Sequence, residues 1–355
     1  MNLINFPYKK LFLTFLMYIA LLPIAMISIA LGAYNMPLKE VFRCLLSPWN
    51  SQGETSIAYT IMWQYRVPRT LAAMLTGATF AFSGAVIQGV TRNPLASPFT
   101  LGISTAASFG AAITIIAGVK VLGLSQTIFS TTQGFAVIAA AALLFSFIQT
   151  AIVLTLAYLK GLSPESIVLM GIATTYIYSA GITFLQYFAG ETQLREYVHW
   201  VIGDLMRVDW SKIPILVLVF VVTVSSIVYL AWDLNALSLG DDVAKNLGVN
   251  PKRVRLLASL LSSIATAIVV SITGPIAFVC LMAPHMARLF IGSDNRYLLP
   301  LSMAMGSALL TLSDTVARIA MKPVELPVGA VTSLLGALFF VSLYLAHRRR
   351  VVMSF

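Results

Sequence analysis

The sequence predicts an all-α polytopic membrane protein with about ten transmembrane helices in a single domain over residues 1–355. Two observations predict this class. Hydrophobic residues make up 59% of the 355 residues and charged residues only 10%, with a mean hydropathy of +0.89, far above that of soluble domains. In addition, apolar stretches of about 20 residues recur along the chain, which is the length a helix needs to cross about 30 Å of hydrocarbon.

The apolar stretches are bounded by charges or by clusters of Gly, Pro and Asn. The approximate spans are 11–33, 67–90, 99–119, 134–158, 163–189, 212–232, 255–273, 275–291, 297–318 and 328–346. The first is longer than the apolar region of a signal peptide, so we expect a retained helix. The second opens with Arg66 and Arg69 around a proline and closes on Asn93 and Pro94, which cannot continue a helix.

The positive charges predict the orientation of the spans. An even number of spans puts both termini on one side, and Lys9, Lys10 and residues 348–350, all arginine, place that side in the cytoplasm. The segment 233–254 then also lies in the cytoplasm. The formal net charge of +10 reflects this topology and contact with anionic lipid, and we expect no nucleic-acid partner.

The cytoplasmic segment 233–254 contains the pattern of a short helix. Leu239, Val243 and Leu247 recur at four-residue spacing, and Gly248 supplies a stop. Asn250 followed by Pro251 is a good start for the next helix. The pattern therefore predicts an amphipathic helix outside the membrane, from residue 239 to 247. It either rests on lipid headgroups or docks a soluble partner.

The sequence contains no motif for catalysis. It has no GxxxxGK[ST] phosphate loop, no HExxH and no Cys/His cluster, so we expect neither an enzyme nor a metal site. Ionisable residues inside the spans are scarce, which argues against an ion-coupled carrier. Asp314 is the clearest exception, and Arg318 lies four residues later on the same helix face, where the two can neutralise each other. The energy for any transport therefore comes from outside the chain.

Four separated stretches resemble one known family in the expected order. They are RVPRTLAAMLTGATFAFSGAVIQGVTRNPLASPFTLGIS (66–104), LNALSLGDDVAKNLGV (234–249), GPIAFVCLMAPHMARLFIGSDNRYLLP (274–300) and PVELPVGAVTSLLGALFF (323–340). They look like the signature stretches of FecCD-type permeases, the membrane subunits of ABC importers for ferric siderophores, haem and cobalamin. The likeness runs from about residue 60 to the C-terminus.

The resemblance implies a type II ABC importer permease fold in the cytoplasmic (inner) membrane of a prokaryote. It implies four kinds of partner: a second permease subunit in a homodimer, two cytoplasmic ATPase subunits that bind ATP and Mg, an extracytoplasmic solute-binding protein, and membrane lipid. The chain itself then needs no cofactor. The sequence does not separate the possible metal chelates, and an ion-coupled secondary transporter or channel is the alternative class.

The resemblance also implies roles for particular residues. Arg66, Arg69 and Arg318 receive carboxylates of the binding protein, a task that suits the planar guanidinium group; the alternative is that the first two only extend to lipid headgroups. Asn93 and Leu95 belong to the cytoplasmic gate, or else form an ordinary connector.

Two further sets of residues complete the predicted sites. The ATPase coupling residues are Leu239, Gly240, Asp241, Asp242, Ala244, Leu247 and Gly248. The aromatic residues Phe184, Tyr187 and Phe188 line the pathway, or else face lipid or the core. The small residues Gly77, Ala81, Gly84 and Ala85 are assigned to close helix packing.

Overall fold

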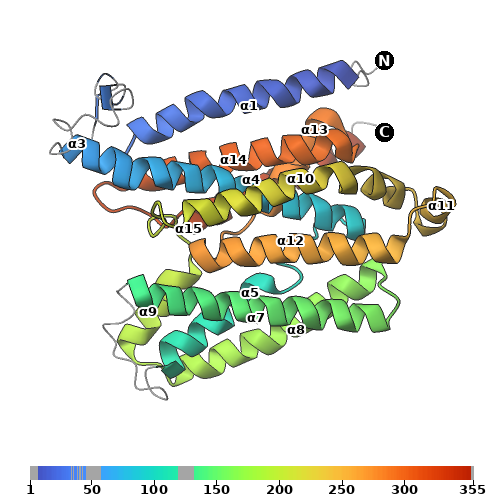
Figure 1. Cartoon of the computed structure of the whole chain (residues 1–355), viewed down its shortest axis with the longest axis horizontal. Helices are drawn as coiled ribbons and strands as arrows, with labels where there is room; N and C mark the ends of the chain where they lie inside the picture. The colour runs from blue at the N-terminus through green and yellow to red at the C-terminus, as the bar shows by residue number, and fades with distance from the viewer. Residues whose placement is uncertain are drawn as a thin grey trace.

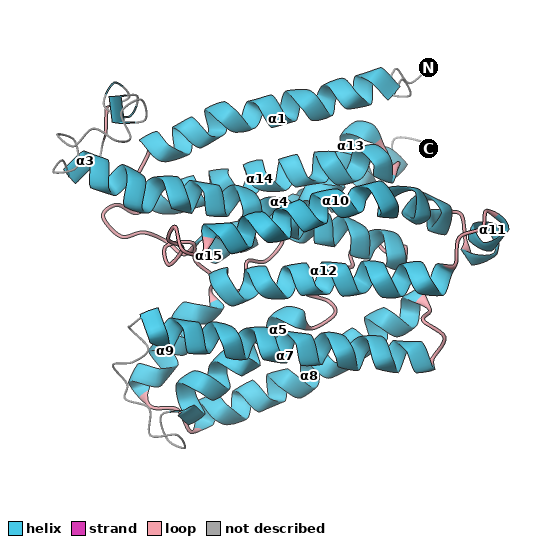
Figure 2. Ribbon diagram, in the orientation of Figure 1, coloured by secondary structure: helices cyan, strands magenta, loops and turns pink. Residues whose placement is uncertain are grey.

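The computed structural model describes residues 7–32, 34, 36, 37, 39, 41, 43, 44, 57–118 and 132–352. Within these residues every named element is a helix, and the only β-type pairing is an isolated bridge between Met321 and Val324. Figure 2 shows the same helical architecture. The predicted all-α class is confirmed.

Ten helices follow the predicted spans in order. They are α1 (Pro7–Ala30), α4 (Val67–Thr91), α5 (Ile103–Ala112), α7 (Thr132–Leu159), α8 (Pro164–Tyr187), α10 (Ile213–Ser238), α12 (Pro251–Thr273), α13 (Val279–Ile291), α14 (Asn295–Ile319) and α15 (Val328–Val352). A π-helical segment, η3 (Ile113–Ala117), extends α5. In the described part of the chain, seven helices are long and apolar enough to cross a membrane, and two shorter apolar helices accompany them.

The helix of the second span begins earlier than predicted. The second span is preceded by α3 (Ile57–Thr60) and by the π-helical segment η2 (Ile61–Arg66), so one continuous helix runs over Ile57–Thr91. Arg66 and Arg69 therefore lie within a helix and not at its start. The wider turns of η2 directly precede Pro68, which cannot donate the ordinary helical hydrogen bond. In addition, the polar stretch 190–211 contains helix α9 (Glu191–Val201), which was not among the predicted helices.

Helix α4 lies at the centre of the bundle and contacts α14, α12, α10 and α13 (Figure 1). Glycines allow these close contacts. A methyl group on Gly77 would lie 2.2 Å from the carbonyl oxygen of Gly306, and one on Gly84 would lie 1.8 Å from that of Cys280. The packing role predicted for Gly77 and Gly84 is confirmed, and Ala81 and Ala85 are fully buried beside them.

The two ends of the bundle differ. Figure 1 shows both termini at the end that carries α11 (Asp241–Asn246), whereas α3 and α9 lie at the opposite end. We call these the α11 end and the α9 end. The arrangement agrees with an even number of spans and groups the segment 233–254 with both termini.

Candidate functional site

The three arginines predicted to act together do meet at the α9 end. Arg66, Arg69 and Arg318 line one cavity of about 230 Å³, together with Glu325 and residues of neighbouring elements. Arg66 and Arg69 come from the continuous helix over Ile57–Thr91, and Arg318 comes from the last turn of α14. All three side chains are largely buried, so the cavity is a recess in the bundle and not a flat basic surface.

Three acidic residues of the same chain lie next to Arg69, and one of them also binds Arg318. Asp314, whose side chain is 0% exposed, accepts a hydrogen bond from Nε of Arg69 at 2.9 Å and another from Nε of Arg318 at 3.0 Å. The predicted pairing of Asp314 with Arg318 is confirmed. Nη1 of Arg69 also donates to Oε2 of Glu325 at 2.6 Å, and its Nη2 lies 3.9 Å from Oδ1 of Asp204. We call Arg66, Arg69, Arg318, Asp204, Asp314 and Glu325 the arginine cluster, which is formally neutral.

Arg66 has a different environment from its two neighbours. Its Nη1 donates to the main-chain oxygens of Ile29 and Ala30, each at 2.9 Å, and its Nη2 donates to that of Tyr34. Within the described residues no acidic side chain forms an ion pair with it. Arg66 thus lies in the cavity with its guanidinium bound to main-chain oxygens and without an acid in direct contact among the described residues.

At the α11 end, the predicted gate residues form the turn that follows α4. Arg92 ends this helix with a φ of 49°. The Oδ1 atom of Asn93 then accepts the N–H of Leu95 at 2.9 Å, as in a typical Asx turn. Asn93 and Leu95 are both exposed. The turn is therefore ordered, and its side chains remain available for a contact outside this chain.

The short helix of segment 233–254 exists but is shorter than predicted. It covers Asp241–Asn246 because Leu239 still caps α10 and Gly240 has a φ of 108°. The stop at Gly248, with a φ of 83°, is confirmed, and so is the Asn250 cap, whose side chain accepts the N–H of Arg253.

The apolar row on this segment points away from the rest of the chain. Leu239 and Leu247 are 63% and 62% exposed and Val243 is also exposed, whereas Ala244 is fully buried. Asp242 pairs with Lys245 at the surface, with 3.1 Å between Oδ1 and Nζ. A cavity of about 520 Å³ opens beside α11 against the first turns of α8 and α12.

Asp241 fastens α11 to the bundle. Its two carboxylate oxygens accept hydrogen bonds from Nη1 and Nη2 of Arg255 at 2.7 and 2.5 Å, and Oδ1 accepts a further one from Nη2 of Arg92 at 2.6 Å. Arg255 is 1% exposed and also donates to the main-chain oxygens of Val90 and Leu162. The hydrogen bonds from Arg255 lower the pKa of Asp241. We call Asp241, Arg92 and Arg255 the Asp241 junction.

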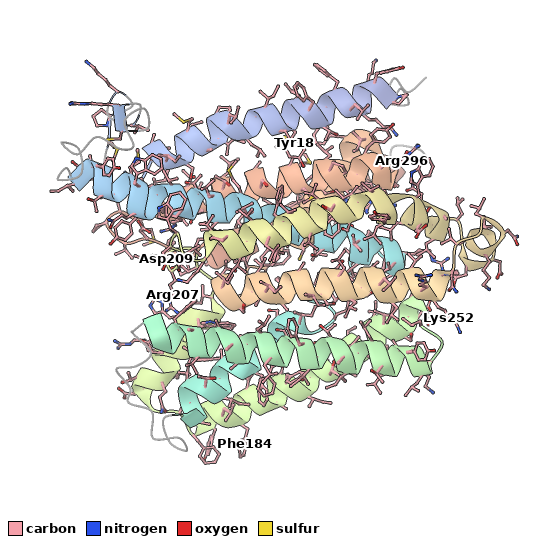
Figure 3. All side chains as sticks on the ribbon, viewed as in Figure 1. Tyr18, Phe184, Arg207, Asp209, Lys252 and Arg296 are labelled. Atoms are coloured by element: carbon pink, nitrogen blue, oxygen red, sulfur yellow. The ribbon has the colours of Figure 1, made fainter. Side chains whose placement is uncertain are left out.

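The roles of Arg92 and Arg255 in this junction were not predicted, since nothing in a linear pattern shows that the end of α4, helix α11 and the start of α12 meet at one point. Figure 3 shows Lys252, near the start of α12, at the same end as α11, and Asp209 at the opposite end.

The three predicted pathway aromatics remain exposed in this chain. Phe184, Tyr187 and Phe188 lie at the end of α8, with exposed rings. The ring centroids of Phe184 and Tyr187 each lie 5.0 Å from that of Phe188, in edge-to-face geometry. They form one aromatic surface that is open to lipid, to a passing solute or to another subunit.

Comparisons with known proteins agree with one family over nearly the whole chain. The model of the FecCD transport family matches residues 19–348. The chain is 39% identical to a protein of Methanocaldococcus jannaschii named as an ABC transporter permease, over 97% of either chain. It is 34% identical to the hemin transport system permease protein of Yersinia pestis, over 92% of this chain and 95% of that protein.

A solved structure agrees as well. An inward-facing conformation of a transporter described as of the metal-chelate ABC type gives a TM-score of 0.79 at 30% identity and covers 94% of this chain and 98% of that chain. The family match includes every residue of the arginine cluster and of the Asp241 junction.

Proposed function

Since the chain belongs to the FecCD transport family and is a multi-pass ABC transporter permease, we propose that it passes a metal chelate across the cytoplasmic membrane. The cargo is a ferric siderophore, haem or a corrinoid. Two partner ATPase subunits supply the energy, and a second copy of this chain completes the pathway. The named cargo of the Yersinia pestis relative and the metal-chelate type of the solved structure support this class.

The observation that carries the proposal is the position of α11. A partner that hydrolyses ATP must push on a rigid element, and α11 is held by three charge-assisted hydrogen bonds at Asp241. The exposed row of Leu239, Val243 and Leu247 then offers apolar surface for the ATPase to bury. A loop without this attachment could not transmit a rigid-body movement.

The remaining predicted sites have complementary roles in this proposal. The arginine cluster receives carboxylates of a solute-binding protein on the extracytoplasmic side, and the turn at Asn93 and Leu95 helps to close the pathway on the cytoplasmic side. Both termini and α11 are then cytoplasmic. The aromatic surface of Phe184, Tyr187 and Phe188 lets a large chelate slide past without a specific grip.

An ion-coupled secondary transporter is the second candidate. That class needs a carboxylate inside the spans that can exchange a proton or an ion. Asp314 is 0% exposed and accepts hydrogen bonds from two arginines, so its charge is already neutralised within the chain. This geometry favours the ABC importer.

Crosslinking tests the proposed contact with the ATPase. A cysteine placed at Asp242, whose side chain is 95% exposed, is expected to crosslink to a cytoplasmic ATPase subunit in membranes. A cysteine at the exposed position Tyr229 on α10 is the control. If no position from 239 to 247 crosslinks to a soluble partner, α11 rests on lipid and the importer proposal loses its mechanism.

Copurification identifies the cargo. The intact complex is purified with its solute-binding protein, and mass spectrometry of the bound ligand is expected to show a metal chelate. A free inorganic ion in place of a chelate would contradict the proposed substrate class.

A further inference from the structure

We propose that Glu325 occupies, in the free subunit, the part of Arg69 that a partner carboxylate takes on docking, so that docking is an exchange of carboxylates. The inference rests on the proposed docking role of the arginine cluster and adds a residue and a mechanism to it. Its starting point is the 2.6 Å hydrogen bond between Nη1 of Arg69 and Oε2 of Glu325.

The charges of the cluster require an exchange. Three arginines face three acids of the same chain, so an entering carboxylate finds no excess positive charge there. Asp314 and Glu325 already bind the guanidinium of Arg69, and a third carboxylate there would be repelled strongly in a partly buried site. One of the resident acids must therefore move before a partner acid can bind to Arg69.

Of the two acids that form hydrogen bonds with Arg69, Glu325 is the more exposed and can leave more easily. Asp314 is 0% exposed and binds both Arg318 of α14 and Arg69 of α4. It cannot leave without removing an ion pair from each of these arginines. Asp204 lies 3.9 Å from Arg69, beyond hydrogen-bond distance, and does not block it. Glu325 is 25% exposed, lies between the end of α14 and the start of α15, and lines the cavity.

Departure of Glu325 prepares the cavity for one new negative charge. Arg66, Arg69 and Arg318 then face only two acids, which leaves a net charge of about +1 at the arginine cluster. Arg66 lines the same cavity and forms no ion pair with an acid in the part of the chain that the structure describes. The vacated site has already accommodated a glutamate side chain, so the matching partner group is an Asp or Glu side chain of a soluble protein.

The variant Glu325→Gln tests the exchange by a gain of binding. Glutamine keeps the shape of the side chain but binds Arg69 without charge, so it competes less well. The measurement is the Kd between the permease complex in lipid nanodiscs and the solute-binding protein that copurifies with it. We expect binding to tighten about fivefold to tenfold at low salt, with a smaller gain at high salt.

Two controls separate charge from position. Glu191→Gln removes the same charge from an exposed residue in the first turn of α9, at the same end of the bundle, and is expected to change the Kd less than twofold or so. Glu325→Asp keeps the charge but shortens the side chain, and an intermediate gain is expected. This second variant decides the matter if Glu325→Gln fails to fold.

The outcomes distinguish the exchange from docking itself. Arg66→Glu reverses a charge in the cavity and is expected to abolish association. If Arg66→Glu binds normally, docking at the cluster is wrong and the exchange falls with it. If Arg66→Glu abolishes association but the Glu325 variants bind no more tightly than Glu191→Gln, only the exchange is wrong.

Discussion

At the α9 end three acids lie next to Arg69 and one of them also binds Arg318, whereas at the α11 end one acid binds two arginines. The acids at the two sites differ in burial, because Asp314 is 0% exposed and Asp241 is 35% exposed. They also differ in what they connect. Asp314 ties α14 to the helix over Ile57–Thr91, which are two long elements of the bundle core. Asp241 ties a six-residue helix at the surface to the ends of α4 and α12. Ion pairs of the same kind therefore join two core helices at one end and hold a short surface helix at the other.

The largest effect is expected from Asp314→Asn, which removes the buried acid that joins Arg69 and Arg318 at the α9 end. The change leaves Arg69 and Arg318 next to each other with one fewer negative charge, and removal of one partner from a buried pair costs about 3–5 kcal/mol. We expect a large fall in the midpoint of thermal unfolding in detergent. The control is Asp209→Asn, which removes an acid that is 53% exposed and paired with Lys212. Equal midpoints of thermal unfolding for the two variants would show that the ion pairs of Asp314 do not stabilise the bundle.

The next largest effect is expected from Asp241→Asn, and it concerns coupling. The Asn side chain has one accepting oxygen and no charge, so it binds Arg92 and Arg255 more weakly than the carboxylate of Asp241 does. The bundle itself keeps its core contacts. Transport by the reconstituted complex is expected to fall about tenfold while ATP hydrolysis continues, a change of roughly 1.4 kcal/mol in coupling.

Asp242→Asn is the matched control for Asp241→Asn. Asp242 lies next along the same helix but is 95% exposed and pairs with Lys245 at the surface, so little change is expected. If Asp241→Asn lowers the unfolding midpoint as much as Asp314→Asn does, the proposed difference between the two ends is wrong.

The helical core could be predicted from the sequence because it depends on local patterns. Apolar length placed the ten spans, and the Gly248 stop and the Asn250 cap placed the end of α11 and the start of α12. The pairing of Asp314 with Arg318 was also predictable, since four-residue spacing puts both on one face of a helix. The start of the second helix could not be predicted, because η2 continues this helix through Gln64, Tyr65 and Arg66, before Pro68.

The partners of Arg69 and Arg92 could not be predicted. Arg69 meets Asp314 and Glu325, which lie 245 and 256 residues further along the chain, and Arg92 meets Asp241 at a separation of 149 residues. Such contacts depend on which helix ends come together in space. The sequence therefore indicated which arginines gather at the α9 end, but not that Asp314 and Glu325 of the same chain already bind Arg69.

A third prediction concerns the turn next to the Asp241 junction. Asn93 and Leu95 follow Arg92 directly, so a movement of α11 that reaches Arg92 also reaches them. If they close the pathway, replacing both with Ala removes bulk from the narrowest level and is expected to raise passive leak severalfold without ATP. The measurement is the efflux of a trapped chelate from proteoliposomes. Leu159→Ala, at an exposed site at the end of α7, is the control, and a leak equal to that of the unmodified complex would make this turn an ordinary connector.

The smallest effect is expected from pH, and it separates the Asp241 junction from a titrating switch. Hydrogen bonds from Arg255 lower the pKa of Asp241 below the ordinary value of about 3.9. For an acid with a lowered folded-state pKa, the stabilising contribution is complete above the unfolded-state pKa and is lost only as the pH falls through the lowered value. The ratio of transport to ATP hydrolysis should therefore stay flat from about pH 8 to about pH 5, and Asp241→Asn should lower that ratio equally at every pH in this window. A loss of coupling near pH 6 that disappears in Asp241→Asn would mean that the carboxylate titrates within the window and that the junction acts as a pH sensor and not as a fixed joint.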